Sequence, residues 1–324
     1  MSDRRISTGH AAAHGAARAS GTSRSSERRG DDDHDPPLAP GAELTPGYTI
    51  VGLLDRSHAL EVYEVWSRER ECRCVAKTVR RSRSDNHHLV THVLNEGRYL
   101  QGFTHPHLVR WYETIEVPTV IVILEAVPGQ TLDYLIGATR RPVPARSLVH
   151  LGLHLCSAMQ YLHRHDVLHL DLKPSNVVCC HGIAKVLDLS LARPPGPVDP
   201  GTGTPGYLSP EQARGGMVTT AADVWGIGSV LSETATGRRP FEPEDRADRY
   251  PQLTSRAPAV RTRRPRLPRQ LSAVIDACLE PLSSDRPSVA AVTTTLGRLV
   301  AAPAAPREPV PAGPGACAQE PPGM

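Results

Sequence analysis

The sequence has few aromatic side chains, almost no net charge and no long apolar run. Aromatic residues make up 4% of the 324 residues, and 37 Lys and Arg against 34 Asp and Glu leave a net charge of +3. So small an excess gives no reason to expect nucleic acid or an anionic membrane as a partner. A membrane helix needs about 18 or more consecutive apolar residues, which no stretch provides. We therefore expect no membrane span.

The sequence also shows neither a secretory leader nor a metal-binding cysteine pattern. Its first residues include Arg4, Arg5 and His10, where a leader would have an apolar core. This predicts a cytoplasmic protein. The seven cysteines are scattered and lack the paired spacing of zinc ligands. We expect reduced structural thiols rather than a zinc site or disulfides.

Composition divides the chain into three parts. Residues 1–46 are rich in Ser, Arg, Ala, Gly and Pro, and residues 301–324 are rich in Pro and Ala. Because neither stretch has the apolar periodicity of a packed core, both are expected to be disordered tails. The part between them, residues 47–300, has strand-like segments first and helical spacing later. It predicts an α+β fold with a small β-rich N-lobe (residues 47–127) and a larger α-helical C-lobe (residues 128–300).

Strands and helices can be placed within these lobes. Five strands are expected in the N-lobe, at residues 48–54, 61–66, 73–79, 109–115 and 119–126. One helix interrupts them, because Leu89, Val93 and Leu100 recur at helical spacing. Glu96 lies one turn before Leu100, on a face that can turn inward. Four helices are expected in the C-lobe, at residues 148–163, 221–236, 268–279 and 288–299.

The most informative segment reads His169-Leu-Asp-Leu-Lys-Pro-Ser-Asn176 and is followed by Asp188-Leu-Ser190. It resembles the catalytic loop and the metal-binding motif of eukaryotic-type serine/threonine protein kinases, as they occur in bacteria. Further positions match the family in order: Lys77 in a Cys-Val-Ala-Lys strand, Glu96 on the next helix, residues 203–211 as the end of an activation segment, Asp223, and Arg286, which would pair with Glu211. The resemblance covers about residues 47–300 and implies a bilobal protein-kinase fold.

The resemblance implies an enzyme that transfers the γ-phosphate of ATP to Ser or Thr hydroxyls of proteins. Asp171 would accept or orient the substrate proton, and Lys173 would face the γ-phosphate. Lys77, paired with Glu96, would contact the α- and β-phosphates. Hard cations prefer oxygen ligands, and the residues that would hold Mg²⁺ or Mn²⁺ are Asn176 and Asp188.

The nucleotide pocket and the partners also follow from the resemblance. Adenine would be enclosed by the apolar and hinge residues Val62, Val75, Leu124, Glu125, Val127 and Val178. The implied partners are ATP and protein substrates that carry Ser or Thr. Self-association for autophosphorylation is a further expectation, with Thr202 or Thr204 as the acceptor.

The chain departs from the family in the loop between the first two strands. Family members carry G-x-G-x-x-G there, because glycines let backbone N–H groups approach phosphates. Here Asp55, Ser57 and Leu60 occupy these positions. In addition, Leu170 replaces an Arg that in many kinases pairs with a phosphorylated activation loop, so a switch of that kind is not expected.

Two other functions compete with an active protein kinase. The missing glycines suggest a pseudokinase that acts as a signalling scaffold with weak or no ATP turnover. A small-molecule phosphotransferase would share the Asp-x-x-x-x-Asn pattern, but residues 203–211 resemble a platform for protein substrates. We favour the active kinase because all the polar positions that the chemistry needs are present: Lys77, Glu96, Asp171, Asn176 and Asp188.

Overall fold

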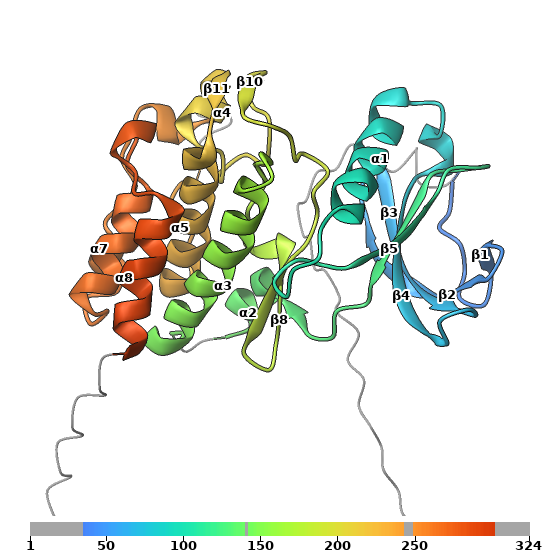
Figure 1. Ribbon diagram of the computed structural model, residues 1–324, viewed down its shortest axis with the longest axis horizontal. Helices are drawn as coiled ribbons and strands as arrows, with labels where there is room; N and C mark the ends of the chain where they lie inside the picture. Colours follow the sequence, from blue (N-terminus) through green and yellow to red (C-terminus); the bar gives the residue numbers. More distant parts are fainter. Residues whose placement is uncertain (1–34, 140–141, 243–248, 302–324) are drawn as a thin grey trace, which may run out of the picture.

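The computed structural model describes residues 35–139, 142–242 and 249–301, which form two lobes. A twisted sheet with helix α1 (His87–Gln101) makes up the N-lobe, and a group of helices makes up the C-lobe (Figure 1). The predicted α+β fold with two lobes is confirmed. The predicted tails at residues 1–34 and 302–324 lie outside the described residues.

The N-lobe is built on a six-stranded sheet with the strand order β1-β2-β3-β4-β6-β5. All neighbouring strands in it are antiparallel. Helix α1 packs against β4, β5 and β6. Its N-terminus is capped by Asn86, whose side chain accepts hydrogen bonds from two backbone N–H groups. The strands are β1 (Glu43–Thr45), β2 (Tyr48–Arg56), β3 (Leu60–Ser67), β4 (Cys72–Val79), β5 (Trp111–Ile115) and β6 (Ile121–Glu125).

The two faces of this sheet bury different sets of side chains. The inner face, toward α1 and the C-lobe, belongs to the main core of the protein. The outer face has a second core around Ile50, Tyr63 and Ile123, against which Leu38 and Leu44 pack. The prediction that residues 1–46 form a disordered tail is therefore wrong for residues 35–46. The composition of residues 35–46 could not reveal this packing, because the apolar partners of Leu38 and Leu44 come from strands further along the chain.

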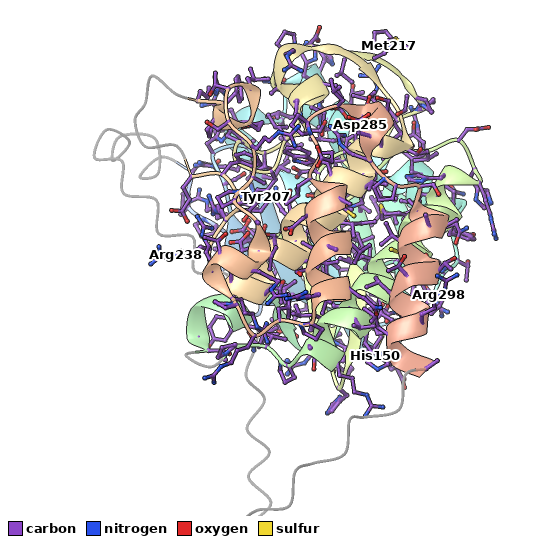
Figure 2. The ribbon with its side chains drawn as sticks, turned by 90° about the vertical axis from the view of Figure 1, so that its left-hand side faces the viewer. His150, Tyr207, Met217, Arg238, Asp285 and Arg298 are labelled. Carbon is purple, nitrogen blue, oxygen red and sulfur yellow. The ribbon has the colours of Figure 1, made fainter. Side chains whose placement is uncertain are left out.

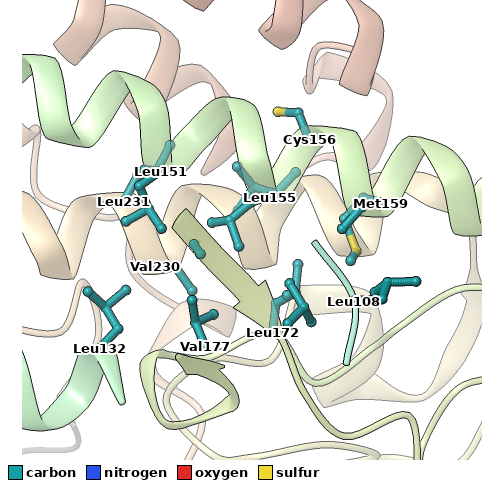
Figure 3. Packing of buried hydrophobic residues seen from close by; sticks show 14 of the residues in the cluster. Leu108, Leu132, Leu151, Leu155, Cys156, Met159, Leu172, Val177, Val230 and Leu231 are labelled. Atoms are coloured by element: carbon teal, nitrogen blue, oxygen red, sulfur yellow. The ribbon is translucent and has the colours of Figure 1, made fainter. Parts of the chain in front are cut away.

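In its described residues the C-lobe contains five longer α-helices, two short α-helices and two small sheets. Helix α3 contacts both α5 and α8, and α7 also contacts both α5 and α8. Figure 3 shows Leu155 and Met159 on α3, with Leu108 near Met159, and Val230 of α5 belongs to the same main core. The larger elements are α2 (Leu132–Ala138), α3 (Ala145–His163), α5 (Thr220–Thr236), α7 (Arg269–Cys278) and α8 (Val289–Ala301), and the shorter helices are α4 (Pro210–Arg214) and α6 (Val260–Arg263).

Short strands carry the loops between the lobes. Strand β8 lies between β7 and β9 in one sheet, and β10 pairs with β11 in another. The sequence analysis did not predict them, because runs of two to four residues are too short for a period-2 pattern to be seen. Their bounds are β7 (Gln130–Thr131), β8 (Val177–Cys180), β9 (Ile183–Val186), β10 (Gly196–Val198) and β11 (Gly216–Val218).

Two expectations about what the protein lacks can be compared with the described residues. Within residues 35–301, gaps excepted, no helix has the length and apolar character needed to cross a bilayer. Six of the seven cysteines fall in this part of the chain, and these six are free thiols.

Candidate active site

Three ionised side chains from separate elements meet between the lobes. Lys77 Nζ on β4 lies 2.7 Å from Glu96 Oε2 on α1 and 2.9 Å from Asp188 Oδ1 in the loop after β9. The side chains of Lys77 and Glu96 are 8% and 1% exposed. Such buried charges are tolerated only when they are paired. The strand, the helix and the loop are thus held together by one ammonium group.

The electrostatics of this cluster follow from one cation shared by two carboxylates. Burial opposes the charge on Lys77, but Asp188 and Glu96 outweigh this and raise the pKa of Lys77. Burial would raise the pKa of Asp188, whereas Lys77 and two hydrogen bonds to Ser190 lower it well below its ordinary value. For Glu96, burial dominates and raises the pKa to about 7. Glu96 is therefore the member of the cluster that titrates near neutrality.

A second polar cluster lies in the loop between α3 and β8. Asp171 Oδ1 accepts a hydrogen bond from the Thr204 hydroxyl at 2.6 Å, and Asp171 Oδ2 pairs with Lys173 Nζ at 2.7 Å. Lys173 also donates to Thr204 at 2.7 Å. The Asn176 amide group donates to the backbone carbonyl of Asp171 at 3.0 Å. Asp171 is thus fixed in orientation by both its own loop and the segment that contains Thr204.

A buried carboxylate at the start of α5 holds the backbone of the loop that carries Asp171. Asp223 is 1% exposed and accepts the backbone N–H groups of His169 at 2.9 Å and Leu170 at 2.8 Å. The His163 ring completes the set at 2.7 Å. Burial would raise the pKa of Asp223, but hydrogen bonds and the charge of His163 lower it. An ionised carboxylate therefore orients the backbone that carries Asp171.

The segment after Thr204 is tied to the C-lobe by two side chains. Arg286, whose side chain is 0% exposed, pairs with both carboxylate oxygens of Glu211 at 2.6 and 2.8 Å. Gln212 donates to the carbonyls of Leu170 at 2.8 Å and Thr202 at 3.0 Å. Figure 2 looks onto this end of the C-lobe, with Asp285, the residue before Arg286, labelled. The sequence analysis missed Gln212, for which the Ser209-x-x-Gln capping box was the available signal.

The position of the segment before Thr204 depends on apolar packing. Leu170 is 4% exposed and belongs to a small buried cluster with Leu168, Val198, Val218 and Ala222. Val198 and Val218 come from the β10–β11 pair, which joins the two ends of the segment. Leu170 thus makes an apolar contact at the position where many of the kinases that the sequence resembles have a phosphate-binding Arg.

The residues expected to enclose the nucleotide lie around the cleft side of the sheet. Directly opposite residues of antiparallel strands share a face, and Val62 is opposite Lys77. Val75 is opposite Leu124 in the same way, and both pack in the main core with Val127. Val178 is buried on β8 below the sheet, opposite Thr131 of β7.

Glu125, at the end of β6, has a partner that the sequence analysis did not foresee. Both of its carboxylate oxygens contact Lys185 Nζ of β9, at 2.6 and 2.7 Å. Because β6 belongs to the N-lobe and β9 to the C-lobe, this ion pair closes the connection between the lobes. Neither residue belongs to a local sequence motif, so only the fold could bring them together.

The loop without glycines is a tight hairpin between β2 and β3. Ser57 and Leu60 pair through a backbone hydrogen bond of 2.9 Å, and the Ser57 hydroxyl accepts the N–H groups of Ala59 at 3.2 Å and Leu60 at 2.9 Å. Asp55 is opposite Val62, so it lies on the cleft side. Arg56 is opposite Glu61 and lies on the outer face.

Comparison with known proteins agrees with this geometry. Residues 56–295 match the model of the protein kinase domain. The chain belongs to the protein kinase family. This kinase is 31% identical over 209 residues to a probable serine/threonine-protein kinase of Streptomyces coelicolor, which covers 60% of the chain and 31% of the relative. It is also 34% identical over 161 residues to the serine/threonine-protein kinase PknB of Mycolicibacterium smegmatis, covering 45% and 25% of the two chains.

A third relative matches over a longer stretch. The serine/threonine-protein kinase PrkC of Bacillus subtilis is 26% identical over 243 residues, covering 72% of the chain and 37% of the relative. This kinase thus spans between a quarter and somewhat over a third of the length of these curated relatives.

The donor atoms of the site are oxygens, which suit a hard cation such as Mg²⁺ or Mn²⁺. In the described part of this kinase, no three or more His, Cys, Asp and Glu side chains gather as a metal-binding group. Asn176 and Asp188 nevertheless provide amide and carboxylate oxygens in the cleft, beside Asp171 and Lys77. Mg²⁺ is commonly held by one or two such groups together with water and substrate phosphates. The residues present therefore fit Mg²⁺ or a similar ion that arrives with a nucleotide.

Proposed function

We propose that the protein is a serine/threonine protein kinase that transfers the γ-phosphate of ATP to hydroxyl groups of proteins. The observation that carries the proposal is the arrangement around Asp171, whose carboxylate is held between Lys173 and Thr204. The Lys77–Glu96 ion pair is formed at the same time. Phosphoryl transfer depends on positioning and charge stabilisation, and these two clusters supply both.

Each cluster has a distinct task in this proposal. Asp171 orients the substrate hydroxyl and accepts its proton, while Lys173 offsets the charge that develops on the transferred phosphoryl group. Lys77 holds the α- and β-phosphates, and Glu96 fixes its direction. Asn176 and Asp188 are the residues that would hold Mg²⁺, which neutralises phosphate charge when bound. Val62, Val75, Leu124, Val127 and Val178 enclose adenine, with the Glu125 backbone at the hinge.

The conformation of the activation segment supports activity without a prior phosphorylation. Leu170 packs among Val198 and Val218, and the β10–β11 pair is already in place. A chain in which all the polar positions meet in this way does not need the pseudokinase hypothesis. Autophosphorylation at Thr202 or Thr204, a cytoplasmic location, and tails at residues 1–34 and 302–324 stay part of the proposal.

The direct test is phosphoryl transfer from γ-labelled ATP to the protein itself and to a generic basic protein, with Mg²⁺ and with Mn²⁺. The matched control is Asp171→Asn, which keeps the size of the side chain and removes the base. We expect incorporation on Ser and Thr that falls at least about a hundredfold in the control. Absence of incorporation in the unmodified protein, together with no thermal shift on adding ATP and Mg²⁺, would refute the proposal.

A further inference from the structure

The polypeptide that precedes the kinase domain places a carboxylate in a buried position. Asp35 is 8% exposed. Its carboxylate accepts hydrogen bonds from the hydroxyl of Ser82 at 2.7 Å and from the backbone N–H of Ser82 at 3.1 Å. Arg80 Nε lies 3.4 Å from the same oxygen. Burial would raise the pKa of Asp35, but Ser82 and Arg80 outweigh burial and lower it.

The same residue also contacts the glycine-free hairpin. The backbone carbonyl of Asp35 accepts a hydrogen bond from Arg56 Nη2. Arg56 Nε pairs with Glu61 Oε1 at 2.9 Å across the hairpin. Glu61 Oε2 accepts from the Tyr63 hydroxyl at 2.7 Å, and that hydroxyl accepts from the backbone N–H of Leu38 at 3.0 Å. A continuous set of contacts therefore joins residues 35–38 to both strands of the hairpin.

These contacts connect two parts of the site that are far apart along the chain. The hairpin covers the cleft where phosphates would lie, and Val62 and Asp55 face that cleft. Ser82 lies in the short 3₁₀ helix η1 (Arg81–Arg83), which precedes α1, the helix that carries Glu96. Asp35 is thus bonded on one side to the hairpin and on the other side to the approach to α1. Tyr63 belongs to the core on the outer face of the sheet, and Arg56 and Glu61 are opposite each other on that face.

We propose that Asp35 and Arg56 are positioning residues for the nucleotide. In related kinases the flexible backbone of a glycine-rich loop adjusts to the phosphates. In this protein the side-chain contacts of Asp35 and Arg56 hold the hairpin in the position that the phosphates require. We call the contacts among Asp35, Arg56, Glu61 and Ser82 the outer brace. The inference rests on the proposed kinase function. It adds the residues that determine the position of the hairpin relative to the phosphates of ATP. A glycine-rich loop reaches phosphates because its backbone adapts, whereas a hairpin with side chains at these positions must be held in one geometry beforehand.

The first test uses steady-state kinetics of the full chain with two variants, Asp35→Asn and Arg56→Gln. Asp35→Asn keeps the shape of the side chain and removes its charge, and Arg56→Gln shortens the side chain and removes its charge. Because a positioning defect in the phosphate-covering loop weakens nucleotide binding, we expect the KM for ATP to rise about fivefold to tenfold while kcat stays within about twofold. The double variant should resemble the single variants, since each change interrupts the same series of contacts, at the Asp35 carboxylate in one case and between Arg56 and the Asp35 carbonyl in the other. Asp85→Asn, at an exposed carboxylate three residues after Ser82, is the matched control and should behave like the unmodified protein.

The second test is hydrogen exchange of the free protein, which does not require catalysis. Loss of the outer brace should accelerate exchange at residues 54–62 about tenfold in both variants, with residues 220–236 unchanged. The result that overturns the proposal is unchanged exchange at the hairpin with an unchanged KM for ATP. Equal acceleration throughout the chain would also overturn it, because it would show a role in global stability only. If the unmodified protein transfers no phosphate, the kinase function fails, while the exchange experiment still decides whether the brace holds the hairpin.

Discussion

Gly97 controls how closely α1 approaches the sheet, and its replacement by Ala should separate Glu96 from Lys77. A Cβ atom at Gly97 would lie 2.4 Å from Thr114 Oγ1 and 3.3 Å from Val122 Cγ2. Relieving the first contact requires a shift of about 1 Å, since non-bonded heavy atoms prefer about 3.5 Å or more. Overpacking of this kind costs about 1–3 kcal/mol, partly offset by about 1 kcal/mol from the higher helix propensity of Ala. Because Glu96 is the preceding residue, the same shift moves its carboxylate away from Lys77.

The assay compares Gly97→Ala with Gly137→Ala, where an added Cβ would meet no side chain and no backbone of another segment within 4 Å. We expect the melting temperature of Gly97→Ala to be roughly 4–8 °C below that of the control, as about 2 kcal/mol would produce in a domain of this size. A misplacement of about 1 Å should lower phosphoryl transfer up to about a hundredfold. Thr114→Ala removes the contacted oxygen, so the double variant should regain most of the activity relative to Thr114→Ala alone. Full activity and an unchanged melting temperature in Gly97→Ala would refute the reasoning.

Three further predictions concern charges in and around the site. The pKa of Glu96 is raised to about 7, so its ion pair with Lys77 forms as the pH rises. We therefore expect kcat/KM to increase with pH through about 7. Glu96→Gln should abolish this pH dependence. Arg286→Lys keeps the positive charge but loses the bidentate geometry with Glu211 and hydrogen bonds to backbone carbonyls. It should lower the free energy of unfolding, measured by urea titration, by about 1–3 kcal/mol, and an unchanged midpoint contradicts this. Asp55→Asn removes a negative charge from the cleft side and should lower the Kd for ATP about fivefold by calorimetry, whereas an equal or weaker affinity would show that this carboxylate does not face the phosphates.

The residues of the candidate site could be selected from sequence because the chemistry of the family fixes their order and spacing. Lys77 and Asp171 are 94 residues apart, yet the family pattern selects both. In the structure their clusters are joined by a backbone hydrogen bond from Leu187, the residue before Asp188, to Asn176. The long helices and strands were predicted for a simpler reason, since each carries enough apolar residues for its period to be visible.

Other features could not be predicted because they depend on contacts with no local signal. Asp35 lies in a Pro-rich stretch, and its partner Ser82 is 47 residues away. The Glu125–Lys185 ion pair spans 60 residues in the same way. In the sequence the charged residues of these pairs look like ordinary exposed residues. Only the folded structure shows that they are paired and largely removed from solvent.

The second core on the outer face of the sheet bears on how the kinase domain can be isolated. A fragment that began at residue 47, where composition places the boundary, would lose Leu38, Leu44 and strand β1. Tyr63, Ile50 and Ile123 would then lose part of their cover, and strand β2 would become an edge. Uncovered apolar patches and free strand edges promote aggregation. Recombinant fragments should therefore start before Asp35, and poor solubility of shorter ones would be a property of the cut and not of the enzyme.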